Sequence, residues 1–249
     1  MLVHKIATFN VHYMTKMDQI GNLLRDTNVD VCGMQEVAGL QSLKKFIAQF
    51  PEFSGVFDDC YKTYGNGLVF NNNKFELVSK KTHILTEGTR SKKSAFEVSL
   101  RDLHSRETIK FVVMHLNHRW ETSRLNEWKK YKSLTLEEKN VFILGDFNAL
   151  TKKDYTDDEW ESICNTRTQN KWEAPQTALT DQIEMDGFID LQYQFCNSKN
   201  EKPKPTSRFN TRIDYLFCKS DNNVEIMNAE CIQTNASDHS LVTCEILFN

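Results

Sequence analysis

The sequence predicts an α/β fold in which two β-sheets pack face to face and helices cover their outer faces. Two observations lead to this prediction. Helical and strand-like segments alternate near the start of the chain, and short β-rich runs with turn residues between them recur in both halves. Two packed sheets with helices outside bury the apolar faces of both kinds of element. At 249 residues and with no evident internal repeat, we expect one domain over residues 1–249.

Strand and helix alternate before Pro51. The first predicted strand ends at Asn10, and the second ends near Glu36 with apolar residues on both sides, as in a strand covered on both faces. Two other segments carry apolar residues at helical spacing, and Pro51 ends the second of them. The expected strands are residues 2–9 and 29–37, and the expected helices are residues 18–27 and 40–50.

Strands dominate from residue 53 to residue 113. Turn residues such as Tyr64-Gly65-Asn66-Gly67 and Glu87-Gly88 separate short β-rich runs there. A helix over residues 121–134 then leads into Val141 to Leu144, an apolar run typical of a buried strand. The β-rich runs lie near residues 54–57, 67–71, 75–86, 94–101 and 108–114.

The second half combines helices with a β-rich C-terminal part. Thr156, followed three residues later by Glu159, indicates a helix that begins with a capping box. Residues 175–187 suggest a further helix, and a loop rich in Lys and Pro follows at residues 201–205. The final strands are expected near residues 211–218, 224–232 and 240–247.

The composition predicts a water-soluble globular protein. Hydrophobic residues make up 39% of the chain and charged residues 26%, enough for a packed interior under a charged surface. The net charge of -3 provides no global attraction to nucleic acid, so phosphate binding would depend on a local patch.

The seven cysteines include no Cys-x-x-Cys pair, which favours reduced thiols over disulfides or a zinc site. The N-terminal residues lack the pattern of a signal peptide, and no apolar run has the length of a transmembrane helix. We therefore expect an intracellular protein, in the cytoplasm or the nucleus, without a membrane partner. The sequence leaves the oligomeric state open, and a monomer is compatible with it.

The segment Gly145 to Ala149 concentrates chemically useful side chains directly after the predicted strand at 141–144. Asp146 and Asn148 are two residues apart, and alternate residues of an extended chain project to the same side. Both could therefore point into one pocket at the sheet's edge. The alternative is an Asx-type turn, in which the two side chains only cap the backbone. The pattern alone leaves both alternatives open.

Polar residues occur repeatedly where strands are predicted to end. A single carboxylate at such a position is usually just exposed, but the repetition indicates a common site. These residues are Asn10, Glu36, His115, Asp146 with Asn148, Asp214, and Asp238 with His239.

Seven short motifs in this order resemble the endonuclease/exonuclease/phosphatase superfamily. This metal-dependent group includes pancreatic deoxyribonuclease, apurinic endonucleases, inositol-polyphosphate 5-phosphatases and deadenylases. The motifs span residues 8 to 239, nearly the whole chain, and their combination is more specific than any one of them. They are Thr8-Phe9-Asn10, Gln35-Glu36-Val37, Tyr64-Gly65-Asn66-Gly67, His115-Leu116, Gly145-Asp146-Phe147-Asn148, Arg212-Ile213-Asp214-Tyr215 and Ser237-Asp238-His239.

The resemblance implies a four-layered α/β sandwich of two packed, mainly antiparallel sheets flanked by helices, with the site at one end. It also implies roles for individual residues. Glu36 would be the principal ligand of a divalent metal, with Asn10 and Asp238 as further candidates. Asp146 would orient or deprotonate the attacking water, and Asn148 would hold that water or a phosphate oxygen.

The remaining roles concern the histidines and their carboxylates. By the same resemblance, Asp238 would orient His239, which would contact the phosphate or transfer a proton. His115 would stabilise the transition state or the leaving oxygen, and Asp214 would complete the polar network. Carboxylate and amide oxygens suit Mg²⁺ or Mn²⁺ better than softer metals, so magnesium is the expected cofactor.

Residues around the motifs suggest substrate contacts. Arg119 and Arg124 could bind a phosphate or could be solvated helix charges, and Asn66 is a further candidate for substrate binding. Asn117 stands where many members carry Asp, which leaves the support of His115 open. Basic residues that could form a rim around the site are Lys92, Lys93, Arg119, Arg124, Lys152, Lys153, Arg208 and Arg212.

Two features bear on the choice of a polymeric substrate. The acidic stretch from Asp154 to Glu161 could repel a long duplex. Trp120, Trp160 and Trp172 could stack on a base, although such residues more often pack within the protein.

The sequence thus predicts a Mg²⁺-dependent phosphodiesterase, with a nuclease acting on DNA or RNA as the favoured function. A phosphomonoesterase or a 5′-tyrosyl-DNA phosphodiesterase of the same fold is the alternative among enzymes. A catalytically inactive phosphate-binding module is the alternative of another class.

Overall fold

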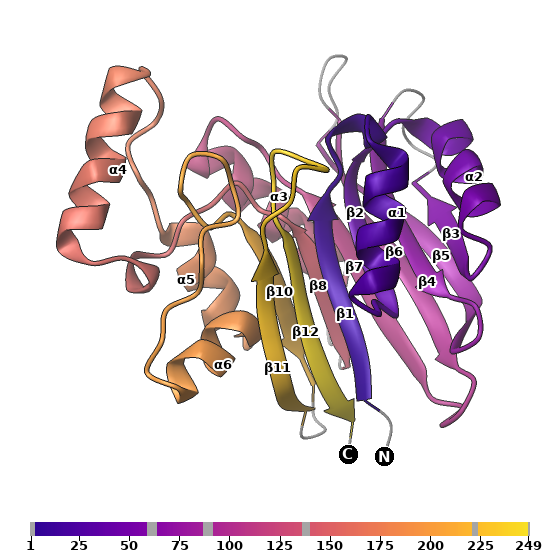
Figure 1. Ribbon diagram of the computed structural model, residues 1–249. Coiled ribbons are helices and arrows are strands. Elements are labelled where there is room, and N and C mark those ends of the chain that lie inside the picture. The colour runs from indigo at the N-terminus through magenta and orange to yellow at the C-terminus, as the bar shows by residue number, and fades with distance from the viewer. Residues whose placement is uncertain (1–2, 59–63, 87–91, 136–139, 221–223, 249) are drawn as a thin grey trace.

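Two six-stranded β-sheets pack face to face in the computed structural model of the chain (Figure 1). The structure describes residues 3–58, 64–86, 92–135, 140–220 and 224–248. The strand order is β11-β12-β1-β2-β4-β3 in the first sheet and β5-β6-β7-β8-β10-β9 in the second. Only β1/β2 and β7/β8 are parallel among the strand pairs of the described residues. The predicted sandwich of mainly antiparallel sheets is therefore confirmed.

The strands of the two sheets have the following bounds. The first sheet contains β1 (Val3–Asn10), β2 (Val31–Val37), β3 (Phe53–Phe57), β4 (Gly65–Asn71), β11 (Val224–Ile232) and β12 (Leu241–Phe248). The second sheet contains β5 (Phe75–Thr86), β6 (Lys93–Asp102), β7 (Thr108–His115), β8 (Val141–Asp146), β9 (Ile189–Asp190) and β10 (Asp214–Lys219).

Helices form the two outer layers. The α-helices are α1 (Met17–Asp26), α2 (Gly39–Gln49), α3 (Glu121–Leu134), α4 (Asp157–Gln169), α5 (Ala178–Met185) and α6 (Leu191–Ser198). Short 3₁₀ turns, η1 and η2, cover His12–Met14 and Lys152–Asp154. Helices α1 and α2 cover the outer face of the first sheet, whereas α4 projects from the sandwich (Figure 1). None of the described helices has the length and apolar character needed to cross a lipid bilayer.

Three apolar clusters account for the layers. The cluster between the sheets joins residues of both, including Ile6 of β1 and Leu144 of β8. A second cluster packs α1 and α2 against the first sheet, with Phe46 fully buried. A third packs α3 and α5 against the second sheet around Trp128. All six residues of β8 are buried, as the continuous apolar run predicts for a central strand.

Two polar contacts also join the sheets. Near the ends of the strands that carry the motifs, Asn66 Nδ2 donates to the backbone oxygens of Ser94 and Val113, 3.3 Å away in both cases. Elsewhere the ring of His4 on β1 lies 2.7 Å from the carboxylate of Asp102 at the end of β6. We call these contacts the Asn66 staple and the His4 staple.

Most predicted elements are confirmed with small shifts at their ends. The capping box is present, because Thr156 Oγ1 accepts from the backbone N–H of Glu159 and the Glu159 carboxylate accepts from that of Thr156. Helix α6 was missed in the sequence, and so was the short strand β9 before it. The predicted Glu87-Gly88 turn and Cys60 lie outside the described residues.

Candidate active site

The motif residues meet at one end of the sandwich. Loops that follow β1, β2, β7 and β8, and those that precede β10 and β12, emerge at this end, whereas both chain termini lie at the opposite end (Figure 1). Register places the central residues opposite one another. Asp146 lies beside His115 in the parallel pair β7/β8 and beside Asp214 in the antiparallel pair β8/β10.

Asp146 divides its two carboxylate oxygens between the backbone and the site. Oδ1 accepts from the backbone N–H of Asn148 at 3.0 Å, the contact expected of an Asx turn. Oδ2 lies 3.2 Å from Asn10 Nδ2, 3.6 Å from His115 Nε2 and 3.9 Å from His239 Nε2. The turn and the pocket are therefore both present, because each uses a different oxygen.

Gly145 allows this arrangement. A Cβ atom at this position would lie 2.3 Å from the backbone oxygen of Met114 on the neighbouring strand β7. No real side chain tolerates such a contact, so the close approach of β7 and β8 at the site requires glycine.

His239 is held by Asp214 and not by its chain neighbour. His239 Nδ1 lies 2.9 Å from Asp214 Oδ2, while the Asp238 carboxylate lies 3.9 Å from His12 Nδ1 and 3.7 Å from a guanidinium nitrogen of Arg208. The prediction that Asp238 orients His239 is therefore wrong. The bend at residues 235–238 directs the Asp238 carboxylate to His12 and Arg208, away from the His239 ring.

Glu36 and Asn10 complete the centre of the site. Asn10 Nδ2 lies 3.2 Å from both Glu36 Oε1 and Asp146 Oδ2, so one amide links the ends of three strands. Glu36 has φ 57°, an unfavourable backbone conformation for a residue with a side chain. Such strain is concentrated at functional sites, where the surrounding structure holds it.

The electrostatics of the centre differ from those of isolated side chains. Burial and the nearby Asp214 carboxylate raise the pKa of Asp146 to about 7. Burial lowers the pKa of His239, but the charge and hydrogen bond of Asp214 together with Asp146 outweigh it and raise that pKa to about 10. Burial, Lys93 and His239 hold the pKa of His115 well below its ordinary value. The two histidines therefore differ in charge at neutral pH, His239 being cationic and His115 neutral.

The donor set fits a hard divalent cation. Asp146 and Asp214 place carboxylate oxygens within 4.8 Å of each other and of His239, and Glu36 is joined to Asp146 through Asn10. The cationic His239 is not counted as a ligand, because a protonated imidazole has no lone pair to give to a metal. Asp214 Oδ1 is buried and has no hydrogen-bond partner among the described residues. An uncompensated carboxylate oxygen beside a second buried carboxylate favours a bound cation, and oxygen donors suit Mg²⁺ or Mn²⁺.

Two residues predicted to bind substrate have internal partners instead. Asn66 is 2% exposed, and its amide donates within the Asn66 staple. Arg124 is 2% exposed and donates to the carboxylates of Glu121 and Glu173 and to the backbone oxygen of Asn117. Both assignments are corrected, because neither side chain has its polar group at the surface.

The remaining predicted residues have more varied surroundings. Asn148 adopts φ 52° and donates through Nδ2 to the backbone oxygen of Leu116. Asn117 does not contact His115: its Oδ1 accepts from the backbone N–H groups of Arg119 and Trp120 at the start of α3. Substrate contact by Arg119, which is exposed, stays a prediction.

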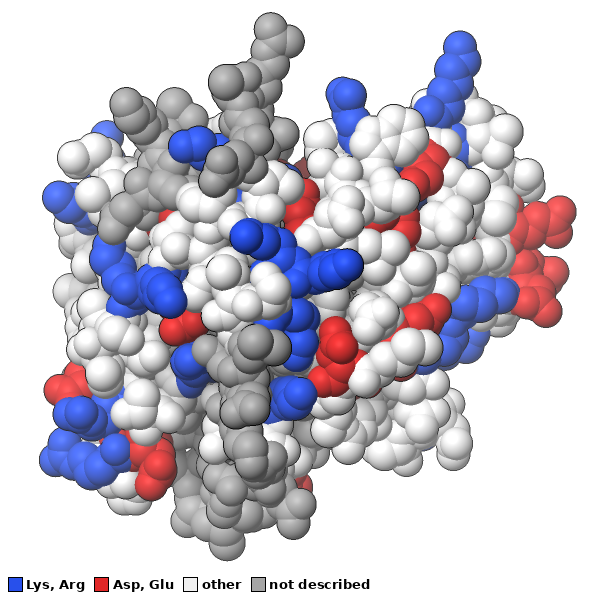
Figure 2. Space-filling model, turned by 180° about the vertical axis from the view of Figure 1, so that it is seen from behind, with Lys and Arg blue, Asp and Glu red and all other residues white. Residues whose placement is uncertain are grey.

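The predicted basic rim is largely neutralised. Arg212 is fully buried between the carboxylates of Asp154 and Asp190. Lys152 pairs with Asp157, and Lys153 pairs with Glu184. Figure 2 shows Lys and Arg near Asp and Glu at several places on one face, with several Lys and Arg side chains next to one another near its middle.

Lys93 is a candidate that the sequence placed only in this rim. It begins β6, and the β6/β7 register that pairs Ala95 with Met114 brings it to the end of β7 where His115 lies. Burial lowers the pKa of the Lys93 ammonium, while the carboxylates of Glu127, Asp146 and Glu36 oppose this effect. The sequence carried no signal for this position beyond a basic residue at the start of a strand.

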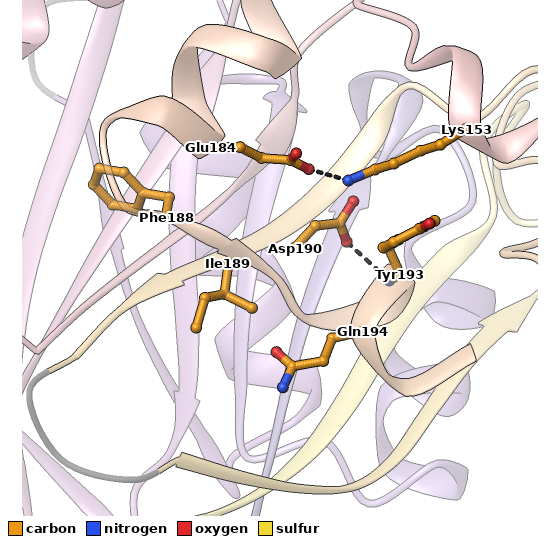
Figure 3. A pocket seen from close by; sticks show the side chains of 7 residues that line it. All are labelled: Lys153, Glu184, Phe188, Ile189, Asp190, Tyr193 and Gln194. Atoms are coloured by element: carbon orange, nitrogen blue, oxygen red, sulfur yellow. Dashed lines mark hydrogen bonds and ion pairs between the residues drawn. The ribbon is translucent and has the colours of Figure 1, made fainter. Parts of the chain in front are cut away.

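Two hollows adjoin the described surface. One, of about 440 Å³, is lined by polar residues that include His239, Asp238 and Arg208, and so opens beside the catalytic candidates. The other, of about 220 Å³, lies between α5 and α6 (Figure 3). Its polar groups are paired, Lys153 with Glu184 and Asp190 with the backbone of Tyr193, so it offers no comparable chemistry.

A two-sheet sandwich with buried carboxylates, amides and histidines at one end defines a phosphoesterase fold. The model of the Endonuclease/Exonuclease/phosphatase family matches residues 7–239, and the chain belongs to this family. No curated protein sequence matches the chain.

Solved structures of similar fold cover nearly the whole chain at low sequence identity. Bacteroides thetaiotaomicron mannosyl-6-phosphatase is 16% identical over 98% of this chain and 100% of its own, with a TM-score of 0.68. The human Nocturnin catalytic domain with bound sulfate is 16% identical over 99% and 94%, with a TM-score of 0.69. D. rerio TDP2 in complex with a single-stranded DNA product is 14% identical over 98% and 99%, with a TM-score of 0.66. These similarities concern the fold.

Proposed function

We propose that the chain is a Mg²⁺-dependent phosphodiesterase that cleaves nucleic acid. The observation that carries this proposal is the convergence of Asp146, Asp214 and His239 within 4.8 Å, with Glu36 linked to Asp146 through Asn10. Hydrolysis of a phosphodiester requires an activated water, compensation of charge on the phosphate oxygens and support for the leaving oxygen. The site offers a group for each requirement.

In this proposal Glu36 and Asn10 hold the metal. When bound, the ion would offset negative charge on the phosphate and favour ionisation of the attacking water. The Asp146 oxygen that faces the site, Oδ2, accepts a proton from that water, while the Asx turn at Oδ1 fixes the orientation of the carboxylate. Asn148 positions the water or a phosphate oxygen.

The histidines act on the other oxygens. Asp214 fixes the His239 ring through Nδ1, which leaves Nε2 directed to the centre of the site as a cationic donor to a phosphate oxygen. His115, neutral in its buried position, donates a hydrogen bond to the leaving oxygen. Lys93 adds positive charge near His115.

A nucleic-acid substrate is supported by the fold neighbour TDP2, whose structure contains a single-stranded DNA product. A phosphomonoesterase is the second candidate. The neighbour from B. thetaiotaomicron is a mannosyl-6-phosphatase, and its TM-score to this chain is close to that of TDP2. The two candidates require the same central groups and differ in what surrounds the phosphate.

An activity panel tests the proposal. The protein would be assayed with Mg²⁺, Mn²⁺ or EDTA on single- and double-stranded DNA, RNA, abasic DNA, 5′-tyrosyl DNA, bis(p-nitrophenyl) phosphate and mannose 6-phosphate. We expect metal-dependent cleavage of the nucleic acids. Hydrolysis of monoesters alone would establish the second candidate, and no turnover on any substrate would indicate a binding module.

A further inference from the structure

The turn after Asn10 holds a tyrosine at the site in an unfavourable backbone conformation. His12, Tyr13 and Met14 have φ angles of 41°, 59° and 54°, in the left-handed region that residues with side chains rarely adopt. The turn is held against the protein interior, because Met14 is buried and the backbone N–H of Val11 donates to the backbone oxygen of Gln35, the residue before Glu36. Three strained residues in succession indicate that this turn has a functional role.

Tyr13 projects from the turn and pairs with a second exposed tyrosine. The two rings, Tyr13 and Tyr64, lie 5.7 Å apart at an interplanar angle of 83°. They are 45% and 42% exposed, so the contact between them does not bury them. Tyr64 directly precedes Gly65, which pairs with Val37, the residue after Glu36. The tyrosine pair therefore lies next to the end of β2, where Glu36, the principal candidate for a metal ligand, is located.

The electrostatics agree with this position. The Glu36 carboxylate is the main cause of a raised pKa at Tyr13, and Asp238 contributes to it. Tyr13 thus lies within range of carboxylates on two sides of the site.

Exposed rings of this kind have a definite chemical use. Both rings keep more than two fifths of their surface exposed, and a nucleobase that is not paired can stack on an exposed aromatic ring. Stacking accepts any base, because every base has a π-face, and it requires a strand whose bases are unpaired.

We propose that Tyr13 and Tyr64 form a stacking platform for one unpaired base of the substrate, next to the cleaved phosphate. This inference rests on the proposed function and adds a preference for a single-stranded segment at the site. The platform acts on substrate position, while the chemistry stays with the residues around Asp146.

A second exposed aromatic pair provides a comparison. Trp172 and Phe209 lie 4.9 Å apart at 81° and are 43% and 45% exposed. Trp172 follows α4, and its neighbour Glu173 is bound to Arg124 of α3. Trp172 thus resembles Tyr13 in its exposed fraction and in its ring geometry, but it does not lie at the strand ends that carry Asn10 and Glu36. Trp172→Leu is therefore a matched control.

The test compares two short single strands with one cleavable phosphodiester each. They differ in whether the nucleotide beside that phosphate carries a base or is abasic, and both the 5′ and the 3′ neighbour are examined. We expect wild-type protein to favour the strand with the base, and Tyr13→Leu and Tyr64→Leu to reduce the ratio of kcat/KM values about tenfold. Tyr13→Phe retains the ring and should restore most of the ratio.

Several results would overturn the platform. These are an unchanged ratio in Tyr13→Leu, an equal fall in Tyr13→Phe, which would assign the effect to the hydroxyl, or a fall confined to Trp172→Leu. Binding of phosphorothioate versions of both strands, measured by fluorescence anisotropy, separates this inference from the proposed function. One outcome is that the protein cleaves none of the substrates while Tyr13→Leu abolishes the difference in Kd between the strand with the base and the abasic strand. In that case the hydrolytic function is wrong and the stacking platform stands.

Discussion

Asp146 and Glu36 both carry carboxylates in the site, but their surroundings differ. Asp146 is 2% exposed, faces two histidines and has its second oxygen fixed by the backbone of Asn148. Glu36 is half-buried, and among the described side chains it accepts a hydrogen bond from Asn10 alone. These surroundings agree with a proton acceptor at Asp146 and a metal ligand at Glu36.

Substitution separates these two roles. We expect Asp146→Asn to reduce kcat by about 10²–10⁴-fold with little change in Mg²⁺ affinity, because a positioned base contributes about that much. Glu36→Gln should weaken Mg²⁺ binding, measured by isothermal titration calorimetry, together with turnover. Asp157→Asn, on the exposed first turn of α4, is the control. Equal loss of metal affinity in both site variants would contradict the division of roles.

The second residue-scale prediction concerns Gly145. Gly145→Ala should destabilise the protein by about 1–3 kcal/mol, because the added methyl meets the backbone oxygen of Met114 and the strands must separate. Urea unfolding measures the change. Gly55→Ala is the control: its Cβ meets only side-chain atoms, the nearest at 3.0 Å, so a smaller loss is expected. Similar losses in both variants would show that the backbone contact is unimportant.

At the scale of elements, α3 is held at its start by a buried ionic network. Arg124 joins Glu121 of the first turn to Glu173 beyond α4, and the backbone N–H of Glu121 also donates to Glu173. The loop that carries His115 into α3 is closed by the same arginine, which donates to the backbone oxygen of Asn117. Arg124 therefore stabilises the loop between His115 and α3, and its guanidinium group does not face a substrate.

Arg124→Met should cost about 3–5 kcal/mol of stability, because it leaves the buried Glu121 carboxylate and the half-buried Glu173 carboxylate without their partner. The melting temperature should fall, while the KM of the remaining folded protein changes little. Arg119→Ala, on the same loop but exposed, should leave stability within about 0.5 kcal/mol. A raised KM without a fall in stability would restore Arg124 as a phosphate-binding residue.

The elements were predictable to the extent that local pattern determines them. Helix α3 and strand β5 have the bounds that the sequence predicted. Helix α6 was missed, since Leu191 and Gln192 are its only buried residues and leave no apolar stripe. Asp190 was an available signal: its side chain accepts from the backbone of Tyr193 as an N-cap.

The site was predictable only as a set of residues. The motifs named the members, but the partner of His239 depends on the β8/β10 register and on the fold of the loop before β12, which no local pattern reveals. For the same reason the sequence could not distinguish buried Arg124 and Arg212 from exposed Arg119. Burial of a long charged side chain is a property of the assembled layers.

At the scale of the whole molecule, the His4 staple couples sheet packing to pH. Burial alone raises the pKa of Asp102, but hydrogen bonds from the backbone of His104 and from His4 bring it below the ordinary value. Because the folded pKa is depressed, the stabilisation is present above the unfolded value and is lost as the pH falls through the folded one.

We therefore expect stability to decline below about pH 4, with Asp102→Asn flattening that decline. Urea unfolding between pH 2.5 and 7 measures it for both proteins. Since Asp102→Asn also weakens the contact at neutral pH, the slope against pH is the diagnostic quantity and not the absolute stability. An unchanged slope would show that other carboxylates control acid unfolding.

Charge distribution sets the expected response of substrate binding to salt. Among the basic residues predicted to form a rim, Lys93, Arg119 and Arg208 remain the candidates for phosphate contacts. Arg208 is exposed and only 3.7 Å from the Asp238 carboxylate, whereas Lys152, Lys153, Arg124 and Arg212 have closer ionic partners. Three contacts to a single strand imply a slope of about -2 for log K against log salt concentration. Fluorescence anisotropy across salt concentrations measures this slope. A flat response would favour a small phosphoester as the substrate.

The segment that contains helix α4 is attached to the rest of the molecule at both of its ends. Asp154, just before it, is bound to Arg212, and Glu173, just after it, is bound to Arg124. Between these points the segment projects from the sandwich (Figure 1). Residues 156–172 could therefore be lengthened, shortened or replaced without disturbing the catalytic end, as long as Asp154, Glu173 and Tyr155, whose hydroxyl accepts from the backbone N–H of Arg212, remain. The segment is therefore a suitable place for a reporter peptide to be grafted.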